Sequence, residues 1–114
     1  MTKQKILSIF KDEAHKFIHP LNLNDWDLRI KFDKVPASDI ANTLADCTNR
    51  VVQISVSNSM PSDEEYIRKV ARHEIYHIFF SKYRYLAEDR YAQEEALAQE
   101  EERLCTILEK LAIA

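Results

Sequence analysis

Two histidines and a glutamate stand at a spacing that suits metal chemistry. His73, Glu74 and His77 form an H-E-x-x-H pattern inside a stretch whose apolar residues have the period of a buried helix. Residues i and i+4 of a helix lie one turn apart on the same side, so both imidazole rings could reach one tetrahedral zinc ion. Glu74 is turned about 100° from His73 and about 60° from His77, so its carboxylate could take a proton from a metal-activated water without binding the metal itself.

Chance rarely produces this pattern in a chain of this composition. With four histidines and 11 glutamates in 114 residues, the expectation is about 0.01 occurrences. The alternative interpretation is that His73 and His77 find ordinary polar partners in a buried helix while Glu74 forms a salt bridge. Because every buried polar group needs a partner, one metal that satisfies both imidazoles is the simpler interpretation. We therefore predict His73 and His77 as zinc ligands and Glu74 as the general base.

Six elements are expected to position this motif. Apolar residues that share one helical face predict a first helix over 3–18. Alternating or apolar stretches predict three strands, over 27–33, 44–47 and 51–57. Between the last two strands we expect a tight turn with Asn49 in the left-handed conformation.

The motif itself lies on the second expected helix. Ser62 is the predicted N-cap of this helix, which should run to about Lys82. A last helix is predicted over 88–111. Because one unbroken helix through both segments would be far longer than the usual ~11–12 residues, we expect a turn near 82–87.

The order of the predicted elements indicates an α+β fold, and composition supports one domain spanning residues 1–114. The chain is 46% hydrophobic and 31% charged, which suits a single domain with one core. No apolar run reaches the ~18 residues of a membrane-spanning helix, so no membrane partner is expected. The N-terminus does not resemble a secretory signal, and Cys47 and Cys105 are expected to be reduced thiols, so we expect a cytoplasmic protein.

Two further counts exclude whole classes of function. Glycine is absent, so the glycine-rich loops that hold nucleotide phosphates cannot form, and Asn or Asp would have to serve wherever φ is positive. The net charge of −3 argues against a general nucleic-acid binder, which would normally present a basic face.

The motif helix resembles that of the zincin superfamily, specifically the small single-domain zinc metallopeptidases of the gluzincin type found in phage and bacterial genomes. The likeness extends loosely over residues 21–111, through a first strand, a hairpin and a closing helix. It implies a minimal zincin-like domain. Phe80 and Tyr83 stand where a metzincin would need Gly and His, which excludes that subclass. A peptide deformylase would use a cysteine as third ligand, but Cys47 lacks the Glu-Gly-Cys sequence of that family, which argues against this interpretation.

This resemblance implies that a carboxylate on the last helix is the third zinc ligand. The last helix carries a stripe of leucines on one face, Leu97, Leu104, Leu108 and Leu111. Measured from Leu104 at 100° per residue, Glu101 falls at about 60°, beside this leucine stripe, whereas Glu102 points away at about 160°. Glu101 also matches the family's Glu-x-x-Leu pattern and is the predicted ligand, which requires the last helix to fold back onto the motif. The candidates weighed for this place are Glu94, Glu95, Glu100, Glu101 and Glu102.

The resulting expectation is a zinc-dependent metallopeptidase whose substrate is a peptide or protein. Glu74 would act as general base and then as proton donor. An extended substrate could pair with the strand at 51–57 if that strand lies at the edge of the sheet. The alternative is a catalytically inactive zincin-fold module that binds metal and acts by binding a partner protein.

Overall fold

The chain forms three α-helices and one three-stranded sheet in the part that the structure describes. A computed structural model describes residues 1–36, 38–88 and 94–113. This arrangement confirms the α+β class and the expected order of elements. In chain order the elements are α1 (Lys3–Lys16), β1 (Asp27–Phe32), β2 (Ala41–Asp46), β3 (Val51–Val56), α2 (Glu64–Glu88) and α3 (Glu94–Ile113).

The sheet has β3 at its centre. Its strand order is β1-β3-β2, with β1 parallel and β2 antiparallel to β3. The prediction that the strand at 51–57 lies at an edge is therefore wrong. Val52, Ile54 and Val56 are fully buried, as expected of a strand with neighbours on both sides. The edge that lies beside α2 belongs to β2 instead.

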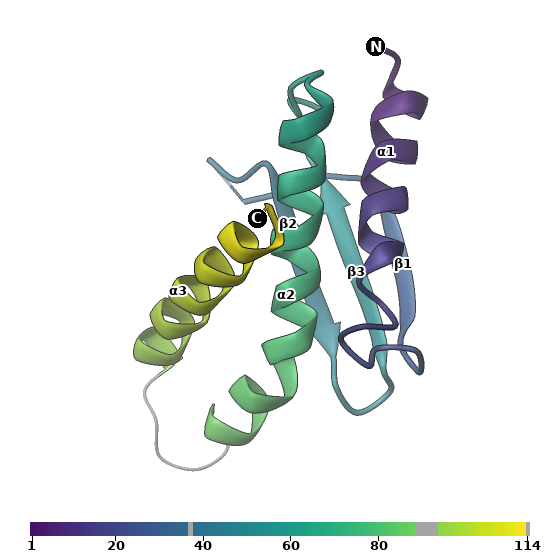
Figure 1. Cartoon of the computed structure of the whole chain (residues 1–114). Helices are drawn as coiled ribbons and strands as arrows, with labels where there is room; N and C mark the ends of the chain where they lie inside the picture. The colour runs from purple at the N-terminus through teal and green to yellow at the C-terminus, as the bar shows by residue number, and fades with distance from the viewer. Residues whose placement is uncertain (37, 89–93, 114) are drawn as a thin grey trace.

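The helices α1 and α2 pack against each other and against the sheet, and α3 packs against α2 (Figure 1). The core lies between the first two helices and β3. Phe10 of α1 and Ile67 and Ile75 of α2 are fully buried there. Because α2 has α1 on one side, α3 on the other and β2 beneath, its side chains face three different neighbours.

A buried ion pair joins α1 to the motif helix. Arg72, which directly precedes the motif, donates through Nη1 to Oε2 of Glu13 at 2.7 Å, and both side chains are buried. Arg68, one turn earlier, donates to the other oxygen of Glu13 at 3.1 Å. Paired charges are tolerated inside a protein when each finds its partner, so this contact holds α2 in a defined place against α1.

The boundaries of α2 differ from expectation at both ends. Asp63 precedes the helix, and its Oδ1 accepts the backbone N–H of Glu65 at 3.2 Å, so Asp63 takes the capping role predicted for Ser62. The helix continues to Glu88, so the turn predicted at 82–87 is wrong. Residues 89–93, between the two helices, lie outside the described residues.

The β2–β3 turn also differs in detail. Arg50, not Asn49, has positive φ (56°). Asp46 organises this turn, since its carboxylate accepts the backbone N–H groups of Thr48 and Asn49. Elsewhere Asn22 has positive φ as expected, but so does Ser38. No helix in the described part of the chain is long and apolar enough to cross a membrane.

Candidate metal centre

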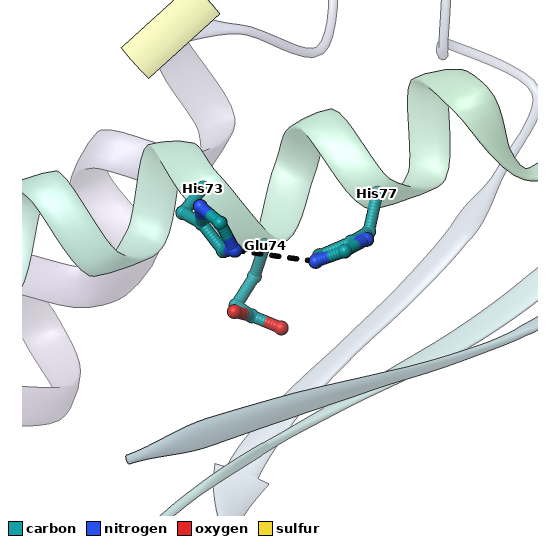
Figure 2. A group of neighbouring side chains, drawn as sticks. All are labelled: His73, Glu74 and His77. Atoms are coloured by element: carbon teal, nitrogen blue, oxygen red, sulfur yellow. Dashed lines mark hydrogen bonds between the residues drawn. The ribbon is translucent and has the colours of Figure 1, made fainter. Parts of the chain in front are cut away.

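The three motif side chains meet on one side of α2. Figure 2 shows the two imidazole rings pointing toward each other and Glu74 directed away from α2 between them. The Nε2 atoms of His73 and His77 are 3.3 Å apart. Donor atoms of His73, Glu74 and His77 all lie within 4.8 Å of one another.

The separation of the two nitrogens fits a zinc ion. Zinc binds imidazole nitrogen at ~2.0–2.1 Å, and two such ligands at the tetrahedral angle stand about 3.3 Å apart. The Nε2 atoms of His73 and His77 have this separation without rearrangement. The donor set is also suitable, because neutral imidazole and carboxylate are both common zinc ligands.

Three glutamates of α3 reach the two rings. Glu102 places one carboxylate oxygen 2.8 Å from Nε2 of His77 and the other 3.2 Å from Nε2 of His73. Glu101 lies on the opposite side of the His77 ring, 3.4 Å from its Nδ1. Glu109 lies 3.0 Å from Nδ1 of His73. The carboxylate beside the two Nε2 atoms therefore belongs to Glu102.

Glu102, which was predicted to point away, lies beside the two Nε2 atoms, whereas Glu101, the predicted ligand, lies beside Nδ1 of His77. The expected fold-back of α3 is present, but its packed face shares only Leu97 with the predicted leucine stripe and is turned away from Leu104. The buried row is Leu97, Glu101, Cys105 and Glu109. At 100° per residue this row is centred about 80° from Leu104, and Glu102 is also about 80° from its centre, within reach of a long side chain.

The other candidates are not brought to the histidines. Glu100 forms an exposed pair with Arg103 at 2.7 Å. Glu94 lies 3.6 Å from Arg84, its side chain 78% exposed. Glu95 is exposed, with no contact to either histidine among the described residues.

Glu101 and Glu109, the two glutamates that face Nδ1 atoms, each have a basic partner on α2. Glu109 lies 3.4 Å from Nζ of Lys69, and Glu101 lies 3.6 Å from Nη1 of Arg84. Both glutamates are buried, so these cations compensate charge where water is scarce. Sequence reasoning missed Glu109, Lys69 and Arg84. One available signal was that positions 102 and 109 are seven apart and so share a helical face.

Glu74 belongs to a different environment from the α3 glutamates. Its buried carboxylate accepts a hydrogen bond from Oγ1 of Thr43 on β2 at 2.7 Å. Burial raises the pKa of the Glu74 carboxyl, while the neighbouring His77 and the Thr43 hydroxyl act in the opposite direction. A raised pKa brings a carboxylate closer to the range in which it exchanges protons efficiently near neutral pH.

The His77 imidazole has a raised pKa. Burial lowers the pKa of its imidazole, but contacts with Cys105 and Glu101 and the charge of Glu74 outweigh burial and raise that pKa to about 11. A metal that bound here would compete with a proton for this ring, because only neutral imidazole is a ligand.

The centre opens into a hollow of about 510 Å³ between β2, α2 and α3. Thr43, Glu74 and Glu102 are among its lining residues, so a molecule in the hollow can touch the proposed base and the metal-facing atoms together. Searches among protein families, curated proteins and solved structures found no match to the chain. The function of this centre is therefore inferred from its geometry.

Proposed function

We propose that the chain is a zinc-dependent metallopeptidase in which His73, His77 and Glu102 hold the ion. The observation that carries this proposal is the convergence of two Nε2 atoms 3.3 Å apart on the carboxylate of Glu102. Glu74 stands beside this cluster, buried and bonded to Thr43 instead. Two histidines and one carboxylate, with a fourth position left for water, are typical of catalytic zinc sites.

When bound, zinc supplies Lewis acidity that lowers the pKa of a water and polarises a carbonyl group. The proton chemistry then falls to Glu74. Its carboxylate accepts the proton of the attacking water and returns it to the leaving amine. Thr43 holds that carboxylate through its 2.7 Å hydrogen bond, which leaves the second oxygen of Glu74 free to face the water.

Glu101 and Glu109 position the two imidazoles. Each faces an Nδ1 atom, Glu101 that of His77 and Glu109 that of His73. A carboxylate that accepts the Nδ1 proton keeps the Nε2 lone pair directed at the metal and makes the ring a better ligand. We therefore propose that Glu101 acts through His77 as a positioning residue.

The surroundings of the candidate centre suit an extended peptide as the substrate. In the described residues β2 is hydrogen-bonded only to β3, so its other edge is free to pair with a peptide backbone. Thr43 lies on this strand beside Glu74, so a paired peptide would pass the base. Two free cysteines, Cys47 and Cys105, support the further proposal of a cytoplasmic location.

Metal analysis followed by peptide cleavage tests the proposal. Purified protein should contain about one zinc per chain, and the zinc-loaded protein should cleave members of an unstructured peptide library, read by mass spectrometry. Glu74→Gln should retain zinc and lose cleavage. Zinc binding without any cleavage would favour the inactive partner-binding module, and absence of zinc binding would overturn both.

A further inference from the structure

A groove continues from the metal centre along β2 and α2. The hollow at the centre shares Thr43, His77 and Glu101 with a neighbouring hollow of about 290 Å³. That hollow in turn shares Cys47 and Tyr85 with a third one, of about 430 Å³. The three hollows therefore adjoin one another in series, with the metal centre at one end.

The far end of this groove is open and rich in apolar side chains, with Asn22, Thr48, Arg50 and Ser81 completing its polar part. Phe79 and Tyr85 of α2 are 44% and 52% exposed there, although large aromatic side chains bury favourably. Trp26, the single tryptophan of the chain, lines the same hollow and is half-buried. A concave surface lined by aromatic side chains is typical of a site for an apolar group. Its apolar lining is completed by Leu21, Leu23 and Ile78.

Two independent lengths place the border of this apolar hollow, marked by Cys47 and Tyr85, relative to the metal. On the strand side, Thr43 and Cys47 are four residues apart, about 13 Å at the ~3.3 Å rise of extended backbone. On the helix side, His77 and Tyr85 are eight residues apart, about 12 Å at 1.5 Å per residue. An extended peptide covers this distance in about four residues.

We propose that the apolar end of the groove is a specificity subsite that receives an aromatic or large aliphatic side chain about four residues from the cleaved bond. This inference rests on the proposed peptidase function, and it adds a substrate preference to it. A peptide held along the free edge of β2 follows the groove from the base to the aromatic residues. The occupant is therefore a side chain of the substrate itself.

Cleavage-site mapping tests the preference. The zinc-loaded protein should cleave a peptide library at sites with Phe, Tyr, Trp, Leu or Met three to five residues away, always on the same side of the bond. Phe79→Ser and Tyr85→Ser should each lower kcat/KM for such sequences by about tenfold to a hundredfold, the value of burying one large apolar side chain. Tyr83→Ser is the matched control, because Tyr83 is 54% exposed on the same helix and does not line the groove.

A binding measurement separates this inference from catalysis. Emission of Trp26 should change on titration with an octapeptide of Ala and Ser that carries one Phe, and much less with the same peptide carrying Ala instead. Phe79→Ser should weaken this binding, and Tyr83→Ser should not. If the protein cleaves peptides without the preference, or binds both octapeptides alike, the subsite is refuted. If it cleaves nothing but binds the Phe peptide selectively, the peptidase proposal fails while the apolar site stands.

Discussion

Replacing two neighbouring glutamates of α3 one at a time separates a metal ligand from a residue that positions a ligand. Glu102→Ala removes the carboxylate that lies 2.8 and 3.2 Å from the two Nε2 atoms. Glu101→Gln keeps the shape of a buried side chain but weakens its hold on Nδ1 of His77. Loss of such an outer partner typically costs 10–100-fold in metal affinity, or about 1.4–2.7 kcal/mol. Loss of Glu102 should cost more than this range, because a ligand disappears.

The same difference should appear in thermal stability. At ~2.1 cal/mol/K per residue, unfolding of 114 residues has an entropy of about 0.24 kcal/mol/K, so each kcal/mol shifts the melting temperature by about 4 °C. In a buffer whose free zinc is held well above the Kd of both proteins, Glu101→Gln should therefore melt about 6–11 °C below the parent. Excess chelator should shrink this gap, because the share that comes from metal binding is then absent.

Zinc affinity is measured by competition with a chromophoric chelator, and melting by circular dichroism. Glu100→Ala is the control, since Glu100 lies on the same helix but pairs with the exposed Arg103. Parent-like affinity in Glu102→Ala, combined with a loss greater than 100-fold in Glu101→Gln, would show that Glu101 is the ligand. That result would refute the orientation of α3 on which the reasoning depends.

Three other perturbations have defined outcomes. Glu74→Gln should keep zinc by elemental analysis but lose about 10² to 10⁴ in cleavage rate, whereas the exposed Glu65→Gln should change neither. Thr43→Val removes a hydrogen bond that favours ionised Glu74, so the acidic limb of the kcat/KM pH profile should move to higher pH. Burial raises the pKa of Glu13, but hydrogen bonds from arginines, Arg72 foremost, lower this pKa on balance. The stability that the Glu13 ion pair contributes is therefore present above about pH 4.3, the pKa of the unfolded state. This stability is lost as the pH falls through the pKa of Glu13 in the folded state. Glu13→Gln should destabilise the protein at pH 7 by about 3–5 kcal/mol and flatten this acid dependence in urea titrations.

The features that sequence reasoning predicted correctly are those that depend on local spacing. His73 and His77 face the same side because four residues make about one helical turn, whatever surrounds the helix. Val52, Ile54 and Val56 share a buried face because side chains alternate along a strand.

The features that it missed depend on how elements meet. The central place of β3 is set when β1 pairs with the edge that β2 leaves free, a contact between residues distant in the sequence. Leucines 97, 104 and 108 suggested one packed face for α3, yet the fully buried Cys105 marks a face turned well away from Leu104. Because a glutamate side chain is long, the rotation of α3 about its axis alone decides whether the carboxylate of Glu101 or that of Glu102 lies beside the Nε2 atoms of the two histidines.

Charge gives an independent reason to place a divalent ion at this centre. Four carboxylates, those of Glu74, Glu101, Glu102 and Glu109, surround the two histidines. Two basic side chains, Lys69 and Arg84, offset two of those charges. A divalent cation would supply the two positive charges that remain, and charge compensation has its largest effect where groups are buried. We therefore expect metal binding to compensate the α3 carboxylates and to favour the docking of α3 on α2.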